Sequence, residues 1–220
     1  MNTIQNKDLK RRILEISHRY KLSHLGSCLT AVDIIDEIYQ TKKKDEKFIL
    51  SAGHAGLALY VVLEKYRWLD AEKIFLHHGV HPDRCSACGL DCSAGSLGHG
   101  LPIAVGMALA DRSKNVYCLI SDGECSEGSI WEAMRIVNEQ TLNNLHIYVN
   151  ANGYGAYKDI DLKQLYAGQI LGFTGVNFRE TNSSYLPFLN GLDAHYHVMI
   201  EEEYEEGMEI LNEKITFIQN

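Results

Sequence analysis

Two short polar motifs each follow an apolar run typical of a buried strand. Ser121-Asp122-Gly123-Glu124 follows the run 116–120, and Asn150-Ala151-Asn152-Gly153 follows the run 145–149. Asp122 and Asn152 lie 30 residues apart, which is the length of a strand-helix-strand unit, so both are expected at the carboxyl edge of a parallel sheet. Their oxygens suit a hard cation such as Mg²⁺, which completes its shell from water and phosphate. Taken singly, each motif is also an ordinary turn after a strand.

Gly123 adds a second hint of an anionic ligand at this edge. A residue without a Cβ lets the backbone approach a phosphate closely, and the start of the following helix offers unpaired N–H groups and the positive end of its dipole. The motif pair therefore predicts a magnesium and phosphate site.

The elements that must position these motifs alternate between helix and strand. Leu9, Ile13, Ile16 and Tyr20 recur at helical spacing and predict a helix over 7–20. A second helix is expected from Thr30, as its cap, to the lysines at 42–44. Further strands are predicted at 48–50, 116–120 and 145–149, and further helices at 54–67, 101–110 and 127–140. Strands separated by helices favour an α/β fold with a parallel sheet.

The C-terminal third has weaker patterns. Strands are possible at 176–178, 195–200 and 215–218, and the acidic run 201–206 starts a helix. Because no repeat or low-complexity linker interrupts the chain, we expect a single domain over 1–220.

Composition excludes several classes of protein. The 220 residues include 21 basic and 29 acidic side chains, a formal charge of -8, which disfavours nucleic-acid binding. No apolar run is long enough for a membrane span, and the polar N-terminus makes a cytoplasmic location the default expectation. The six cysteines are expected to be reduced thiols or metal ligands rather than disulfides.

Together the motifs resemble the fingerprint of thiamine diphosphate enzymes, in the form found in the transketolase family. The resemblance also rests on stretches beyond the two motifs: Glu127-Gly128, Trp131-Glu132-Ala133, Asn143-Asn144-Leu145, Ile49-Leu50-Ser51-Ala52-Gly53-His54-Ala55, Gly95-Ser96-Leu97-Gly98-His99-Gly100, Ala104-Val105-Gly106-Met107-Ala108, Ser23-His24-Leu25-Gly26 and His81-Pro82-Asp83. It implies a thiamine diphosphate-binding fold with a mostly parallel central sheet and helices on both faces.

By this resemblance, thiamine diphosphate is held through Mg²⁺, or through Ca²⁺ or Mn²⁺ in its place. The implied metal ligands are Asp122, Asn152 and the main-chain carbonyl of Tyr154. The implied cofactor contacts are His54, Gly95, Leu97, Gly98, Gly123 and, across a subunit interface, Glu127. Glu127 could equally be a first-turn acid that favours the helix dipole. His24 and His81, with His54, are the implied catalytic histidines, which would face the carbonyl and hydroxyl groups of the substrate.

The implied reaction moves a two-carbon ketol unit from a ketose, a sugar or sugar phosphate, to an aldehyde. In the family, a glutamate of a separate pyrimidine-binding domain starts the chemistry. After Asn152 only 68 residues remain, too few for that domain, so a transketolase C-terminal subunit is expected as partner in a heterotetramer with two copies of each chain. The alternatives are a half-subunit of a 2-oxo acid dehydrogenase or deoxyxylulose phosphate synthase, and a non-catalytic regulatory subunit.

Some features depart from the family. Ser121 replaces a glycine, Leu25-Gly26-Ser27-Cys28 replaces a proline- and glycine-rich turn, and a C-terminal tail with another cofactor-contacting histidine is expected to be missing. Cys85, Cys88 and Cys92, near His81, form a C-x2-C-x3-C cluster. It could bind zinc, act as a redox dithiol, or simply pack in a loop. The other cysteines, Cys28, Cys118 and Cys125, are expected in the core.

Overall fold

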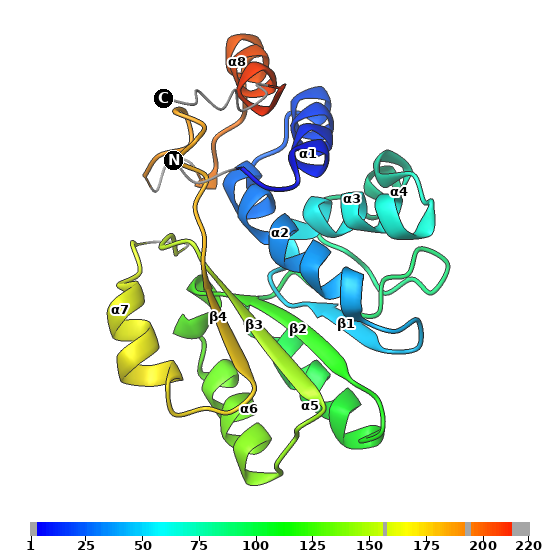
Figure 1. The fold of residues 1–220 in the computed structure, drawn as a ribbon, viewed down its shortest axis with the longest axis vertical. Coiled ribbons are helices and arrows are strands. Elements are labelled where there is room, and N and C mark those ends of the chain that lie inside the picture. The colour runs from blue at the N-terminus through cyan, green and yellow to red at the C-terminus, as the bar shows by residue number, and fades with distance from the viewer. Residues whose placement is uncertain (1–3, 156–157, 192–194, 213–220) are drawn as a thin grey trace, which may run out of the picture.

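The fold is built on a parallel sheet of four strands. A computed structural model describes residues 4–155, 158–191 and 195–212. The strands are β1 (Lys47–Leu50), β2 (Val116–Ser121), β3 (Leu145–Ala151) and β4 (Val176–Glu180), and they lie in the order β1-β2-β3-β4 with every pair parallel (Figure 1). Strands are thus confirmed at 48–50, 116–120, 145–149 and 176–178.

Side chains alternate between two hydrophobic layers along β1 and β2, as the pleat requires. Phe48 and Leu50 pack on one layer, whereas Ile49 packs on the other. Leu119 and Cys118 divide in the same way on β2. The predicted α/β class, with a parallel central sheet and helices on both faces, is confirmed.

The N-terminal helices pack together on one side of the sheet. These are α1 (Lys7–Tyr20), α2 (Leu25–Thr41), α3 (Gly56–Arg67) after the short turn η1 (Gly53–Ala55), and α4 (Ala71–His78). On this side α2 contacts β3. The helix predicted over 7–20 has the expected bounds. α4 was not predicted, although Asp70 is a cap signal: its carboxylate accepts a hydrogen bond from the Lys73 amide at 3.1 Å.

Helix α2 begins earlier than the sequence suggested. Thr30 is not its cap, because the Thr30 hydroxyl donates to the carbonyls of Gly26 at 3.0 Å and Ser27 at 3.2 Å from inside the helix. The hydroxyl that looked like a start signal is instead satisfied by the preceding turn.

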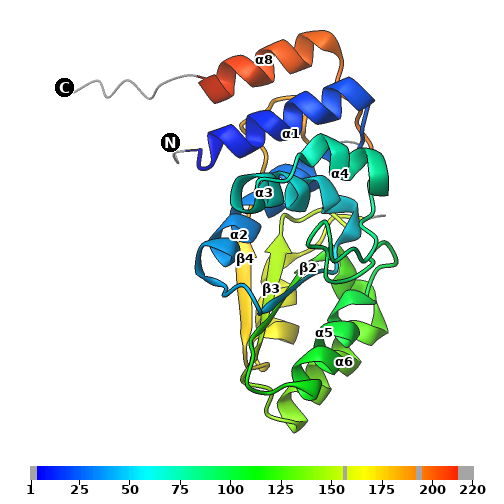
Figure 2. The same cartoon turned by 90° about the vertical axis from the view of Figure 1, so that its right-hand side faces the viewer.

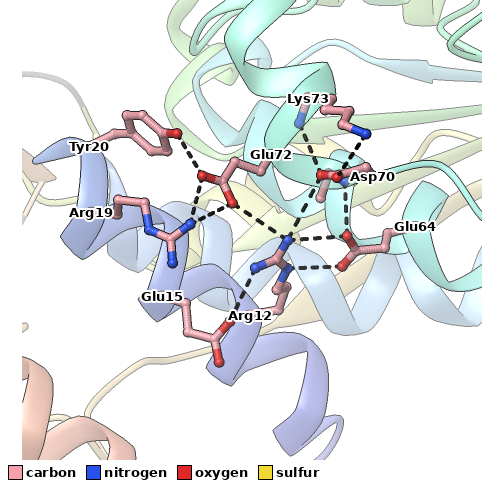
Figure 3. A network of polar contacts seen from close by, with 9 residues as sticks. Arg12, Glu15, Arg19, Tyr20, Glu64, Asp70, Glu72 and Lys73 are labelled. Atoms are coloured by element: carbon pink, nitrogen blue, oxygen red, sulfur yellow. Dashed lines mark hydrogen bonds and ion pairs between the residues drawn. The ribbon is translucent and has the colours of Figure 1, made fainter.

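A network of ion pairs ties α1 to α3 and α4 (Figure 3). The Arg12 guanidinium contacts the Glu64 carboxylate at 3.0 Å. Glu72 accepts hydrogen bonds from Arg19 at 2.8 Å and from the Tyr20 hydroxyl at 2.6 Å. Because several charges share these contacts, the network orients the helices better than an isolated surface pair would.

The opposite face carries α5 (Gly100–Ala110), α6 (Gly128–Glu139) and α7 (Leu162–Leu165). A short turn, η2 (Gly123–Ser126), precedes α6, and a wider turn, η3 (Tyr166–Ile170), continues α7. Cys118 and Cys125 are buried on this side and Cys28 on the other, as expected of core thiols.

The last described helix, α8 (Glu201–Asn212), lies beside α1 at the end of the molecule remote from α5 and α6 (Figure 2). Arg11 donates to the carbonyl of Leu211 at 3.0 Å. The strand considered at 195–200 is wrong, because 197–200 forms no regular structure and pairs with no strand. The strand considered at 215–218 lies outside the described residues. Among the described helices, none has the length and apolar character needed to cross a membrane.

Candidate functional site

The carboxyl ends of β1, β2 and β3 meet at a small pocket. Asp122 follows β2, Asn152 follows β3, and His54 lies in the turn after β1. The pocket is lined by Ser27, Ala52, His54, Ala55, Leu97, Ser121, Gly123, Asn150, Asn152, Tyr154 and His195. The strand-helix-strand spacing therefore brings the two predicted motifs together, as topology requires.

Asp122 is a buried anion that pairs with no cation among the described residues. Asp122 is only 1% exposed. Its two carboxylate oxygens accept hydrogen bonds from the amides of Gly123 at 2.9 Å and Gly153 at 2.7 Å. Burial raises the pKa of Asp122 to about 6, against the opposing effect of these amides. Among the ion pairs of the described residues, none involves Asp122.

Asn152 and Tyr154 stand at the same edge. The Asn152 side-chain oxygen accepts the Tyr154 amide at 3.0 Å, and both residues line the pocket with Gly123. Gly153 between them has a φ of 85°, which favours glycine. A buried carboxylate that pairs with no cation among the described residues, at the same edge as an amide oxygen, fits a hard divalent cation.

Glu124 joins three loops beneath the pocket. Its side chain is fully buried. One carboxylate oxygen accepts the Ser51 hydroxyl at 2.6 Å and the Gly98 amide at 2.9 Å, and the other accepts the Ser121 amide at 3.0 Å. Glu124 belongs to the motif after β2 but was not predicted as a site residue. Only the fold reveals that it fixes the ends of β1 and β2 against the glycine loop.

The glycine loop lies close to the elements around it. Gly98 has a φ of 78°, and a Cβ there would come within 2.8 Å of the Glu127 Cβ. Gly95 lies against the ring of His81, and Leu97 lines the pocket. Glu127 is exposed, and its cofactor contact across a subunit interface stays a prediction.

Three histidine rings gather at the pocket. The His24 ring lies 5.4 Å from the His54 ring, measured between centroids. Burial, with the neighbouring histidines, lowers the pKa of His54 to about 3 and that of His24 to about 4. The His24 Nδ1 atom is buried and has no hydrogen-bond partner among the described residues. His81 is exposed, although it is near enough to disfavour the protonated forms of both rings.

The third ring, His195, was missed from the sequence. Its centroid lies 4.5 Å from that of His24 and 5.5 Å from that of His54. The His24 amide donates to the His195 carbonyl at 3.0 Å, which anchors the C-terminal segment at the site. The expected absence concerned a histidine on a C-terminal tail, whereas His195 lies within the chain and lines the pocket. No local signal marks it, since the pattern at 195–200 favours a strand.

A parallel α/β sheet with an oxygen-rich, histidine-lined pocket at its carboxyl edge defines a protein of the cofactor-binding α/β class. Residues 11–157 match the family described as "Transketolase, thiamine diphosphate binding domain". The chain belongs to this transketolase family.

Relatives include both subunit-type and full-length proteins. The chain is 30% identical to an apulose-4-phosphate transketolase subunit of Phocaeicola vulgatus over 68% of its length and 60% of that protein. It is 31% identical to the 6-deoxy-6-sulfo-D-fructose transketolase subunit SqwG of Clostridium, covering 66% of this chain and 60% of that protein. The human transketolase is 36% identical over 60% of this chain and 24% of its own length.

Among solved structures, transketolase from Leishmania mexicana shares the fold. Its TM-score is 0.57 at 21% identity, covering 76% of this chain and 31% of that one. The predicted thiamine diphosphate-binding fold is therefore confirmed.

Proposed function

We propose that this chain is the diphosphate-binding subunit of a thiamine diphosphate-dependent transketolase that moves a two-carbon ketol unit from a ketose to an aldehyde. The observation that carries the proposal is the buried Asp122 carboxylate, which has no cationic partner in the described part of the chain and accepts the amide of Gly153, between Asn152 and Tyr154. In a thiamine diphosphate-binding domain, such a carboxylate is the natural place for the magnesium that neutralises a diphosphate.

Each part of the pocket has a separate task in this proposal. Asp122, Asn152 and the Tyr154 carbonyl would hold the metal, and Gly123 and the 95–98 loop would lie against the diphosphate. When bound, the cofactor supplies a nucleophilic carbon and an electron sink for the two-carbon fragment. The chain itself would position the cofactor and substrate, exclude water from the pocket and exchange protons with the substrate.

The histidines suit the proton-exchange task. His24 and His54 are neutral near pH 7 because burial lowers the pKa of each ring, so each carries one donor and one acceptor nitrogen. The Nδ1 atom of His24 is buried and finds no hydrogen-bond partner in the described residues. It could exchange a hydrogen bond with a substrate hydroxyl, or donate one to a substrate carbonyl. His195 would share this task, with His81 at the rim.

A partner chain would complete the active site. The similar proteins of Phocaeicola and Clostridium are named as transketolase subunits, which supports a divided enzyme here. The pyrimidine-binding partner, the assembly of two copies of each chain, the sugar or sugar-phosphate substrates and the cytoplasmic location are parts of the same proposal.

Calorimetric titration of thiamine diphosphate with Mg²⁺ tests the metal and cofactor assignment. The full chain is titrated alone and with the candidate partner, and we expect saturable binding in at least the second setting. Asp122→Ala should abolish it, because the variant removes the only charge in the donor set.

Asp45→Asn, which changes an exposed aspartate before β1, is the matched control and should bind like the wild type. Absence of binding by the wild-type chain in both settings would exclude the enzyme proposal. Unchanged affinity in Asp122→Ala would refute the assignment of the metal ligands.

A further inference from the structure

A tight cysteine turn sits outside the cofactor pocket. Cys85 and Leu90 exchange two main-chain hydrogen bonds of 2.9 Å, which closes the segment between them. The Cys88 amide donates to the Cys85 sulfur at 3.3 Å. Gly89 has a φ of 77°, and a Cβ there would lie 2.4 Å from the Arg67 Nη1 atom. The turn thus needs glycine at this position and directs both sulfurs toward α4.

The last turn of α4 meets these sulfurs with an imidazole. The His78 Nε2 atom lies 3.4 Å from the Cys88 sulfur. Ligand atoms of His78, Cys85 and Cys88 all lie within 4.8 Å of one another. In a tetrahedral zinc site with Zn–S of about 2.3 Å and Zn–N of about 2.0 Å, sulfur and nitrogen lie about 3.5 Å apart. The observed separation matches that geometry.

We propose that His78, Cys85 and Cys88 bind one Zn²⁺ ion. Two thiolates neutralise the charge of the ion, and thiolate and imidazole are the donors that zinc favours. In the described part of the chain no other His, Cys, Asp or Glu joins this cluster. The ligands are partly exposed, so water takes the fourth position.

The ligand set differs from the one that the sequence suggested. The Cys92 sulfur contacts the Ser93 carbonyl, 3.0 Å away, and Cys92 packs against the core on the α5 and α6 side, whereas Cys85 and Cys88 pack against the other layer. His81 lies against Gly95. Spacing alone groups Cys92 and His81 with the turn, and the fold separates them from it.

The ion would act as a clip on the segment that reaches the cofactor pocket. Between α4 and the glycine loop, the Ala94 amide donates to the Pro82 carbonyl at 2.9 Å and the Arg84 amide donates to the Ser93 hydroxyl at 2.8 Å. The cysteine turn is the tip of this segment, and His81 and Gly95 lie at its base. Zinc would fix the tip to α4 and so restrict the base.

Metal analysis of the full, untagged chain tests the site without cofactor or substrate, so its result is independent of the proposed function. Protein is purified without chelators from cells grown with zinc, and metal is measured by mass spectrometry. We expect about one zinc per chain, and a loss of about tenfold or more in Cys85→Ser, Cys88→Ser and His78→Ala.

Cys92→Ser and His77→Ala are matched controls, from the same loop and the same helix, and should retain zinc. Cobalt substitution gives a second readout: the wild-type chain should show thiolate-to-cobalt absorption, which Cys88→Ser should lose. A wild-type chain that binds neither metal would overturn the proposal, whether or not the variants fold. A metal-free Cys85–Cys88 disulfide, or full zinc content in the ligand variants, would do the same.

Discussion

At the scale of single residues, the site depends on polar groups that were removed from water and then satisfied by the backbone. Asp122 and Glu124 are both buried, and main-chain amides are their principal donors. The Asp122 carboxylate therefore ties the turn after β2 to Gly153 after β3, and the Glu124 carboxylate joins three loops. The two carboxylates differ in what they bind. Glu124 accepts three hydrogen bonds from within the protein, whereas the donor set around Asp122 fits an added cation.

Glu124→Gln should destabilise the fold. The substitution keeps the shape of the side chain but replaces one carboxylate oxygen by an NH₂ group. That group would face the amide of Ser121 or of Gly98, so that one hydrogen-bond donor meets another. We expect the free energy of unfolding in urea to fall by roughly 1 to 3 kcal/mol. Glu139→Gln on the exposed surface of α6 is the control. Equal effects of the two variants would contradict the role assigned to Glu124.

The buried histidines should make stability depend on pH. The pKa values of His24 and His54 are lowered to about 4 and about 3, chiefly by burial, so below about pH 6.5 the unfolded chain binds protons that the folded chain does not. Their contribution is complete above pH 6.5 and is lost as the pH falls. Each ring should cost on the order of 1 kcal/mol of stability at pH 5.5.

Urea unfolding at pH 7.5 and 5.5 measures this effect. His54→Gln should show a smaller loss between the two pH values than the wild type, whereas His99→Gln, which changes an exposed side chain, should lose as much as the wild type. A His54→Gln profile parallel to that of the wild type would show that this ring does not titrate as described.

At the scale of elements, helix starts place the catalytic candidates. Residues 25–28, where the sequence departs from the family's proline- and glycine-rich turn, form the first turn of α2. His24 precedes this turn and has a φ of 62°. Asn150 at the end of β3 supports this position, because its side chain donates to the Thr30 hydroxyl at 3.0 Å and accepts the Thr181 hydroxyl at 2.6 Å. The helix, and with it His24, is thus fixed to two strand ends.

The close contact between α1 and α8 depends on a glycine. Gly207 is buried on α8, and a Cβ there would lie 2.7 Å from a methyl group of the fully buried Leu14. Gly207→Val should therefore separate the helices and lower the free energy of unfolding by about 1 to 3 kcal/mol. Gly106→Val on α5, where a Cβ meets nothing within 4 Å, is the control. Equal stabilities of the two variants in urea would contradict this packing.

At the scale of the whole molecule, the chain spans about 60% of its subunit-type relatives in Phocaeicola and Clostridium. It also presents apolar side chains on α5, where Ile103 and Leu109 are each 40% exposed. Such a face, next to the glycine loop, is suited to contact with another chain. The proposed pocket would then lie close to an interface.

Mixing experiments test whether the site is divided. With thiamine diphosphate and Mg²⁺, ketol transfer between a set of ketose and aldehyde sugars and sugar phosphates should be absent for this chain alone and for the pyrimidine-domain candidate alone. It should appear when the two are mixed, because the proposed active site takes groups from both chains. Equal turnover by this chain alone and by the mixture would contradict a divided active site.

The sequence by itself determined the layers and the positions of the two main motifs. Apolar runs predicted β1, β2 and β3, whereas β4 had a weaker pattern. The strand-helix-strand spacing was enough to bring Asp122 and Asn152 to one edge, because parallel strands end together. Glycine and cap signals were less decisive. Thr30 looks like the first residue of a helix but lies inside one, whereas Asp70 does cap a helix. The two residues could not be told apart from the sequence, because a short polar side chain can bond to the backbone both at a helix start and within a helix.

Only the tertiary structure decided which distant side chains share a site. His195 reaches His24 and His54 from beyond β4, Glu124 becomes the support of three loops, and Cys92 turns away from Cys85 and Cys88 while His78 turns toward them. Sequence spacing describes neighbours within a turn or a crossover. Contacts between separate segments depend on packing and burial, which no local pattern encodes.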